Sequence, residues 1–296
     1  MGSHVRMCAM TFIERCQTAW HQQASLLCVG LDPELSKLPT ALSDNSAPLD
    51  RVRTFCIGVV EATAAHACAF KPQIAHFAAL GAESVLAEVC DYIKQHHPQH
   101  VLILDSKRGD IGSTAQHYAS EAFDRYGADA VTLNPYMGTD SLQPFLDRAD
   151  KGIFVLCRTS NPGGDEFQMQ TLASGEKLFE RVAATAQQKW NTKGQAGLVV
   201  GATYPAEIAK VRALAPDLPL LVPGIGAQGG DLVATVAAGL TRAQNPAQHP
   251  AGLFINSSRA ILYASAGADW QQAAQAEAQR TQLAIAQAAQ AANAAG

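Results

Sequence analysis

The stretch that decides the fold reads Val101-Leu102-Ile103-Leu104-Asp105-Ser106-Lys107-Arg108-Gly109-Asp110-Ile111. Four apolar residues are followed at once by a carboxylate, an ammonium group and a second carboxylate. Alternate side chains of a β-strand share one face, so we expect Asp105 and Lys107 to point the same way. Such a triplet can also be a surface salt bridge. We interpret it as part of a site, because another lysine, Lys71, ends an earlier apolar strand.

Seven further apolar runs resemble 101–104 and divide the chain regularly: 26–31, 68–70, 130–133, 153–157, 197–200, 220–222 and 253–255. Helical patterns lie between most of them, over 51–66, 74–95, 177–189 and 206–214. Continuous apolar strands that alternate with helices indicate a parallel sheet covered by helices. Eight such units in about 250 residues fit a closed (β/α)8 TIM barrel of the α/β class better than an open sheet.

We expect residues 6–268 to form this catalytic barrel and residues 269–296 to form a tail. The tail is rich in alanine and glutamine, which predicts a C-terminal helix that frays toward Gly296. No function is predicted for it.

Composition excludes several classes of protein. Lys and Arg number 22 against 26 Asp and Glu, so neither nucleic acid nor a membrane surface is an expected partner. No apolar run approaches the ~20 residues of a membrane span. Without a signal-peptide pattern, we expect a cytoplasmic protein. The seven cysteines lack metal spacing and are expected to be reduced, and no metal site is assigned to His96, His97 and His100.

The carboxyl ends of barrel strands carry the active site in this architecture. Asp32 follows the first strand and Lys71 ends the second; Asp32 could also be a simple turn residue before proline. Neighbouring strands lie ~4.8 Å apart, so Lys71 should stand beside Asp105 and Lys107. Opposite charges ~4 Å apart attract by about 4 kcal/mol at an effective dielectric of about 20. The alternation of charges should keep every member of the row ionised. A lysine that can donate a proton would then stand beside a fixed negative charge, and the row needs no metal or organic cofactor to hold this arrangement.

Later strand ends predict how a substrate is held. Ser160, in the segment 157–164, could hydrogen-bond a planar polar ring, although a loop turn alone would explain Asn-Pro-Gly-Gly there. The glycine-rich segment 223–231 lets the backbone approach an anion, and Arg259 follows the eighth strand beside it. The loops after strands seven and eight form the usual phosphate site of such barrels, so we expect a phosphorylated substrate. Asp110 or Ser113 could be only the N-cap of the next helix.

These residues together resemble orotidine 5'-phosphate decarboxylase, in the type 2 branch. The most specific part is the D-x-K-x-x-D-I-G motif at 105–112, followed by Pro-Gly-Ile-Gly-Ala-Gln-Gly-Gly at 223–230. The resemblance covers 27–32, 70–81, 102–114, 131–140, 158–164, 201–202, 222–231 and 256–261. It implies decarboxylation of orotidine 5'-phosphate to UMP and CO2 without a cofactor or metal, the last step of de novo pyrimidine synthesis.

The resemblance also implies a role for each site residue. Its catalytic residues are Lys71, Asp105, Lys107 and Asp110, with Lys107 as the proton donor to carbon 6 and Asp105 against the substrate carboxylate. Its substrate-binding residues are Asp32 and Lys71 for the ribose, Ser160 for the pyrimidine, Gly226, Gln228 and Arg259 for the phosphate, and Thr114. In the family, Asp110 and Thr114 enter the neighbouring subunit's site, which implies a homodimer. The loops 161–175 and 224–230 are expected lids, and no role is predicted for 165–170.

Three other readings remain. A sister sugar-phosphate aldolase or decarboxylase would use the same carboxylates to bind Mg²⁺, and its activity would not survive a chelator. A Schiff-base aldolase is disfavoured, because flanking carboxylates keep a lysine protonated. A non-catalytic sensor of phosphorylated ligands is possible on this scaffold, but it has no need of the complete charged row.

Overall fold

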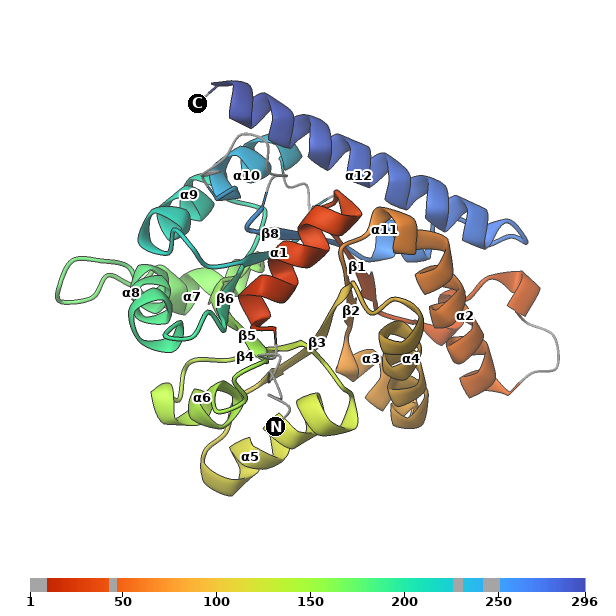
Figure 1. The fold of residues 1–296 in the computed structure, drawn as a ribbon, viewed down its shortest axis with the longest axis horizontal. Helices are drawn as coiled ribbons and strands as arrows, with labels where there is room; N and C mark the ends of the chain where they lie inside the picture. The colour runs from red at the N-terminus through yellow and green to blue at the C-terminus, as the bar shows by residue number, and fades with distance from the viewer. Residues whose placement is uncertain (1–9, 43–46, 226–230, 242–250, 296) are drawn as a thin grey trace, which may run out of the picture.

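The computed structural model describes residues 10–42, 47–225, 231–241 and 251–295. Eight parallel strands close into a barrel in the order β1 to β8 (Figure 1). Their bounds are β1 Leu27–Leu31, β2 Ala69–Pro72, β3 Val101–Arg108, β4 Ala130–Leu133, β5 Gly152–Arg158, β6 Ala196–Val200, β7 Leu220–Pro223 and β8 Leu253–Ser257. The predicted (β/α)8 barrel is therefore confirmed.

Helices surround the barrel and connect its strands (Figure 1). They are α1 Phe12–Gln23, α2 Pro48–Thr63, α3 Ile74–Ala78, α4 Glu83–His96, α5 Gly112–Ser120, α6 Thr139–Leu146, α7 Asp165–Gln168, α8 Leu178–Thr185, α9 Pro205–Leu214, α10 Leu232–Gly239, α11 Arg259–Leu262 and α12 Trp270–Ala295. Short 3-10 turns occupy Leu35–Lys37, Thr40–Leu42, Ala64–His66 and Pro162–Gly164, and π turns occupy Glu121–Arg125 and Ala186–Trp190.

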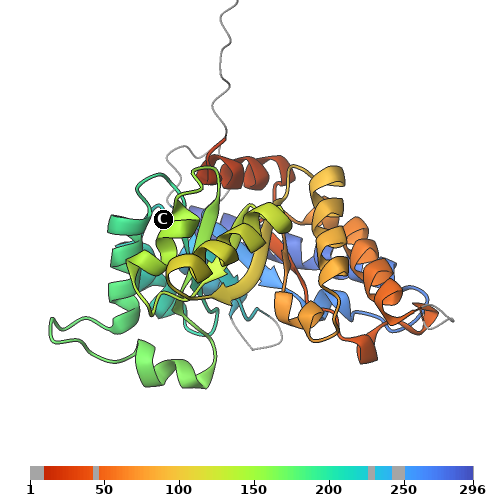
Figure 2. The same ribbon diagram turned by 90° about the horizontal axis from the view of Figure 1, so that it is seen from below.

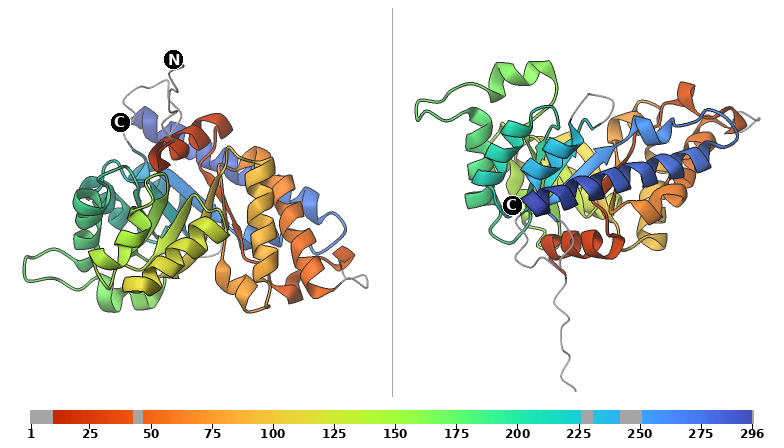
Figure 3. Two further views of the ribbon diagram at one scale, coloured as in Figure 1. Left: turned by 60° about the horizontal axis from the view of Figure 1, so that its bottom comes forward. Right: turned by 90° about the horizontal axis from the view of Figure 1, so that it is seen from above.

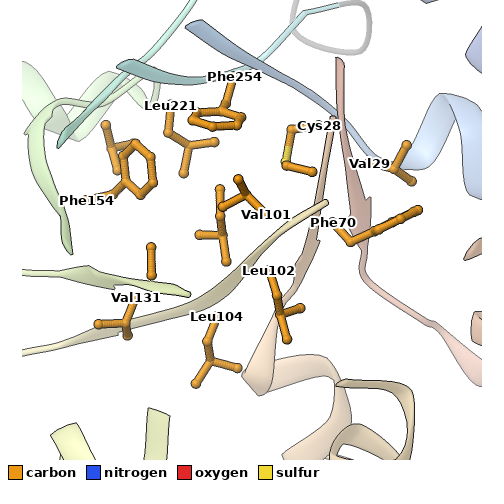
Figure 4. Close-up of a cluster of buried hydrophobic side chains, with 14 of the residues drawn as sticks. Cys28, Val29, Phe70, Val101, Leu102, Leu104, Val131, Phe154, Leu221 and Phe254 are labelled. Atoms are coloured by element: carbon orange, nitrogen blue, oxygen red, sulfur yellow. The ribbon is translucent and has the colours of Figure 1, made fainter. Parts of the chain in front are cut away.

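Aromatic side chains fill the barrel at its amino-terminal end. Phe154 of β5 meets Phe254 of β8 edge to face, with ring centroids 5.8 Å apart, and Leu221 lies beside them (Figure 4). Helix α1 lies across this end of the barrel (Figure 2). Its Phe12 packs on Phe154 with ring centroids 5.8 Å apart. Gly152 has no room for a side chain, because a Cβ there would lie 2.4 Å from the Phe12 ring. The closed end leaves the opposite, carboxyl-terminal end of the strands for a site.

Two predicted helices are interrupted. The pattern over 74–95 forms α3 and α4, because the chain turns at Gly81 with a left-handed φ of +63°. The pattern over 177–189 starts as α8 and continues as a π turn that ends at Trp190. There the indole Nε1–H donates to the Thr139 hydroxyl at 3.0 Å and ties the turn to α6. The apolar periodicity continues on both sides of each break, so periodicity alone could not reveal the breaks.

The predicted C-terminal helix is present as α12 and packs along the barrel, in contact with α10 and α2 (Figure 3). At its start, Trp270 packs on Phe55 with ring centroids 5.4 Å apart. Gly58 of α2 makes room for this ring, since a Cβ at that position would lie 2.3 Å from it. Within the described residues, no helix combines the length and the apolar character needed to cross a membrane.

Candidate active site

Three charged side chains meet where β2 and β3 end. Asp105 accepts a hydrogen bond from the Lys71 ammonium at 2.7 Å through Oδ2 and from the Lys107 ammonium at 2.6 Å through Oδ1. Lys71 and Asp105 are buried, whereas the Lys107 side chain is 45% exposed. The predicted juxtaposition of these three residues is confirmed. It leaves one reachable ammonium group on top of a buried ion pair.

The charges of the row stabilise one another. Burial opposes ionisation of Asp105, but the positive charges of Lys71 and Lys107 outweigh it and hold the pKa of this carboxyl well below its usual range. Burial likewise opposes the charge on Lys71, yet Asp105 and Asp32 raise the pKa of its ammonium group above the ordinary value. A carboxylate and an ammonium ion thus face each other inside the barrel at neutral pH.

The backbone reaches this geometry by a bulge. Leu104 pairs with Val131 and Arg108 with Leu133, so three residues of β3, 105–107, stand opposite one residue of β4. Lys107 itself adopts a left-handed φ of +48°, a conformation that side-chain-bearing residues seldom take. We expected a regular pleat to turn Asp105 and Lys107 to the same side. The two side chains do meet, but the regular pleat was a wrong premise, because the strand pairing is interrupted between them.

Thr132 of β4 fills the gap in the strand pairing. Its hydroxyl donates to Asp105 Oδ1 at 2.8 Å and accepts the backbone N–H groups of Ser106 at 3.0 Å and Lys107 at 2.9 Å. Sequence reasoning missed this residue. A signal was present, since Thr132 is a polar residue two positions from the alanine that opens a short apolar strand. Reading inward positions of β4 like those of β3 would have found it.

A cavity of about 440 Å³ opens above the charged row. Its polar walls come from the β2, β3 and β4 ends and from the segment after β5, and its apolar wall comes from β5, β6 and β7. The lining residues are Lys71, Asp105, Lys107, Thr132, Leu156, Thr159, Ser160, Asn161, Gly163, Gly164, Phe167, Gln168, Val199, Leu221 and Pro223. Predicted residue Ser160 therefore shares one cavity with Lys71, Asp105 and Lys107. The apolar wall lowers the local dielectric and strengthens electrostatic interactions there.

The segment after β5 is held in place by Arg158, which is buried. Its guanidinium donates to Glu207 of α9 and to Asp165 of α7, both at 2.5 Å, and lies 5.0 Å from the Tyr204 ring centroid. Gln168 accepts the Thr159 backbone N–H at 2.8 Å. The segment 165–170, for which the sequence predicted no role, thus carries two side chains that fasten this wall of the cavity.

Asp32 lies next to the row at the end of β1. Its Oδ2 accepts a hydrogen bond from the Ser258 hydroxyl at 2.5 Å, and its charge raises the pKa of Lys71. Its Oδ1 is buried and has no hydrogen-bond partner among the described residues. Asp32 is therefore more than the turn residue that the sequence left open, since its second oxygen is positioned for a further donor.

Asp110 and Thr114 do not line the cavity of their own chain. Asp110 Oδ1 accepts the backbone N–H of Ile111 at 2.8 Å, and Thr114 is exposed on α5. The N-cap position of α5 is Ile111, with no side-chain cap, so neither Asp110 nor Ser113 is the helix cap that was considered. This chain alone brings together Lys71, Asp105 and Lys107, but not the fourth member of the predicted row.

The predicted phosphate site is only partly described. Arg259 is exposed and begins α11, directly after β8 and Ser258. Gly226 and Gln228 lie outside the described residues, as does the part of the predicted lid from 226 to 230.

No group of three or more His, Cys, Asp or Glu side chains that could hold a metal ion occurs within the described ranges. Of the three neighbouring histidines, His97 contacts Glu61 at 2.7 Å and the His100 ring contacts the Ala64 carbonyl at 2.9 Å. The six cysteines in the described part of the chain are buried free thiols. Burial raises the pKa of the Cys28 thiol to about 12 and keeps it protonated.

Known proteins resemble this chain over most of its length. A profile of the family described as orotidine 5'-phosphate decarboxylase / HUMPS matches residues 25–294. The orotidine 5'-phosphate decarboxylase of Janthinobacterium sp. (strain Marseille) is 54% identical over 276 residues, which cover 93% of this chain and 98% of that protein. The protein of the same name from Paracidovorax citrulli (strain AAC00-1) is 57% identical over 279 residues, with coverages of 93% and 98%.

A solved structure agrees in both fold and sequence. The OMP decarboxylase of Leishmania donovani superposes with a TM-score of 0.79 at 37% identity, covering 95% of this chain and 99% of that one. The barrel, the charged row at its carboxyl end and these matches over nearly the whole length lead to one conclusion. The chain belongs to the orotidine 5'-phosphate decarboxylase / HUMPS family.

Proposed function

We propose that the charged row is the catalytic centre through which this chain decarboxylates orotidine 5'-phosphate to UMP and CO2. That reaction is the last step of de novo pyrimidine biosynthesis, and the near-full-length relatives support it. The observation that carries the assignment of the centre is Asp105, a buried carboxylate held between two ammonium groups on the floor of the cavity.

The row supplies both requirements of the reaction. The bond between carbon 6 and the carboxylate breaks, CO2 leaves, and the electron pair stays on carbon 6. Lys107 stabilises that developing negative charge and then transfers a proton from its ammonium group to carbon 6. Its partly exposed side chain can regain the proton from water. Lys71 stays buried against Asp105 and keeps this carboxylate charged and in place.

Asp105 and the apolar wall favour the loss of charge from the carboxylate. A substrate carboxylate beside Asp105 is repelled, whereas the CO2 that replaces it is neutral. Leu156, Val199 and Leu221 offer no hydrogen bonds to a carboxylate, but they accommodate an apolar molecule. The interaction therefore becomes more favourable as the bond breaks, which is the condition for accelerating the chemical step.

The remaining substrate-binding roles follow the strand ends. Asp32, with its unpartnered Oδ1, and Lys71 bind the ribose hydroxyls, and Ser160 contacts the pyrimidine. Gly226, Gln228 and Arg259 bind the phosphate, which lies far from carbon 6. Binding energy from that distant group can close the loops 161–175 and 224–230 over the cavity.

The functional molecule is a homodimer in which Asp110 and Thr114 enter the partner's cavity. Two observations support this. Both residues lie outside the cavity of their own chain, and the segments that follow the paired strands β3 and β4 carry exposed apolar side chains, Ile111, Tyr136 and Met137, of which Tyr136 is 85% exposed. Such a surface is typical of an interface between subunits. We also infer that the protein works in the reducing cytoplasm, which its buried free thiols support.

The principal alternative function is that of a Mg²⁺-dependent sugar-phosphate aldolase or decarboxylase. In this structure, ammonium groups occupy both oxygens of Asp105 at 2.6 and 2.7 Å, in the places where a cation would bind. The test is the change in ultraviolet absorbance when the chain is mixed with orotidine 5'-phosphate in excess EDTA. Conversion to UMP is expected. Failure there, with turnover of a sugar phosphate restored by Mg²⁺, would refute the proposed reaction.

A further inference from the structure

Thr132 is a buried side chain at the centre of the site with no role in the reaction described above. It lines the cavity from β4 and takes part in three hydrogen bonds, one donated to Asp105 and two accepted from the Ser106 and Lys107 amides. A threonine hydroxyl has one hydrogen to donate and two lone pairs. All of these are used, so the two amides leave only one direction for the hydroxyl hydrogen, toward Asp105 Oδ1.

The two amides belong to the bulged part of β3. Strand pairing with β4 stops at Leu104 and resumes at Arg108, so the amides of Ser106 and Lys107 have no carbonyl of β4 opposite them. The Thr132 oxygen replaces that missing acceptor at 3.0 and 2.9 Å. It does so where Lys107 takes a left-handed backbone conformation, which needs support from its surroundings.

We propose that Thr132 is a positioning residue of the decarboxylation, because a single hydroxyl fixes both the Asp105 carboxylate and the backbone that carries Lys107. This proposal rests on the catalytic roles assigned above to Asp105 and Lys107. The ammonium of Lys107 and the carboxylate of Asp105 must both be placed to a fraction of an ångström for proton transfer. Thr132 couples the two positions across the gap between the strands.

Packing alone does not require a hydroxyl group at position 132. The neighbouring cavity residues on β5 and β6, Leu156 and Val199, are apolar, so a valine at 132 would fill the same space. Valine would leave the partly buried amides of Ser106 and Lys107 without the Thr132 acceptor and would remove one donor from Asp105. The comparison of threonine with valine therefore separates positioning from packing.

The test measures kcat and KM for orotidine 5'-phosphate in Thr132→Val, Thr132→Ser and the control Thr63→Val. Thr63 is also buried, and its hydroxyl donates at 2.7 Å to the Val59 carbonyl in α2, outside the cavity. We expect Thr132→Val to lower kcat by about tenfold or more, with KM changed less than about threefold. Thr132→Ser, which keeps the hydroxyl, should recover most of kcat, and Thr63→Val should retain the wild-type value.

A kcat in Thr132→Val within about threefold of the control would overturn the proposal. If Thr132→Val does not fold, Thr132→Cys decides, because a thiol is a weak donor and acceptor of similar size. A lowered kcat in Thr132→Cys supports positioning, and a wild-type kcat refutes it. Asp105→Asn, assayed in parallel, identifies which assignment fails. If it is inactive while Thr132→Val is normal, only the role of Thr132 is lost, whereas full activity of Asp105→Asn refutes the site itself.

Discussion

Asp105 holds the site together through charge. Each of its oxygens accepts a hydrogen bond from a lysine ammonium group, and its partner Lys71 is buried with it. A buried charge that loses its partner is strongly destabilising, because neither water nor an opposite charge remains to solvate it. The residue that drives the chemistry is thus also one on which folding depends.

The first prediction concerns Asp105→Asn. It should lower the free energy of unfolding at pH 7 by about 3–5 kcal/mol, because it leaves the Lys71 ammonium buried without a countercharge. It should also make the free energy of unfolding depend less on pH in acid solution. The folded chain holds the pKa of Asp105 below its ordinary value, so the unfolded chain takes up the proton first and the wild type loses stability below about pH 5.

Urea unfolding at pH 7 and near pH 2.5 measures both effects, because the ordinary pKa of an Asp carboxyl is 3.8 and most of the linked stability is lost below that pH. Lys71 contributes with the opposite sign: its raised pKa adds stability that is complete below its ordinary value of 10.5 and declines at higher pH. Equal acid dependence in the wild type and in Asp105→Asn would contradict the role given to the ion pair.

At the level of residues, the sequence revealed the charged side chains but not what orients them. Lys71, Asp105 and Lys107 were predicted from charges at strand ends, which packing does not explain. The bulge at 105–107 and the left-handed Lys107 were not predicted, because strand alternation assumes continuous pairing. Thr132 was overlooked for the same reason, since its hydroxyl matters only where that pairing fails.

Among the elements, the segment after β5 shows how a loop becomes part of a site. Ser160, Asn161 and Phe167 line the cavity, and Arg158 fastens the segment to α9 through Glu207. A planar guanidinium can meet Glu207, Asp165 and the Tyr204 ring together, which the point charge of a lysine cannot do.

The second prediction follows from this contact. Arg158→Lys should raise KM for orotidine 5'-phosphate by about tenfold with a smaller change in kcat. Without the Arg158 contacts, part of the free energy of substrate binding is used to order the segment after β5. Arg181→Lys is the matched control, since Arg181 pairs with Glu176 on the exposed surface of the molecule. Steady-state kinetics of the two variants measure the difference. Equal KM values would show that Arg158 has no influence on the cavity.

The third prediction concerns α12, which we propose is part of the barrel fold and not a separate tail. Trp270→Ala removes a ring packed on Phe55 and against Gly58 and should lower the free energy of unfolding by about 3–5 kcal/mol. Leu283→Ala, on the exposed side of the same helix, should change it by less than about 0.5 kcal/mol. Chemical denaturation of both variants tests this, and equal small effects would mean that α12 is dispensable for stability.

The sequence predicted the strands and the helices α2, α3, α4, α8 and α9 from their apolar periodicity, whereas α1, α6 and α10 had no predicted range. Its strands agree with the structure to within a few residues, and the largest difference is β3, which continues through its polar residues to Arg108. Breaks within helices were missed, since Gly81 occurs in a segment whose apolar pattern continues on both sides. Composition predicted α12 as a helix, but its contacts with α2 and α10 depend on packing that no local pattern encodes.

At the scale of the whole molecule, the cavity of one chain holds three members of the predicted charged row, Lys71, Asp105 and Lys107, but not Asp110. The Asp110 carboxylate accepts a hydrogen bond from the Ile111 amide beside it, and Ile111 is itself an exposed apolar side chain. If the partner chain supplies Asp110, each active site needs residues from both subunits. The resemblance to a family implied this arrangement, whereas the fold of one chain cannot determine which copy completes which site.

The fourth prediction exploits this sharing. Lys107→Ala and Asp110→Asn homodimers should each be inactive, but mixing and exchanging their subunits should restore about a quarter of wild-type activity, since half of the random dimers carry one intact site. The measurement is decarboxylase activity before and after subunit exchange. Persistent inactivity of a mixture shown to contain mixed dimers would mean that each chain supplies its own Asp110.

The most direct test of the central claim is turnover of orotidine 5'-phosphate by Lys107→Ala, measured beside its affinity for UMP. The control is Lys210→Ala, an exposed lysine that pairs with Glu180 away from the cavity. If Lys107 protonates carbon 6, the variant should fold, bind UMP and lose decarboxylation by at least about 10³-fold, while Lys210→Ala stays fully active. A folded Lys107→Ala protein with turnover within about tenfold of the wild type would contradict the account.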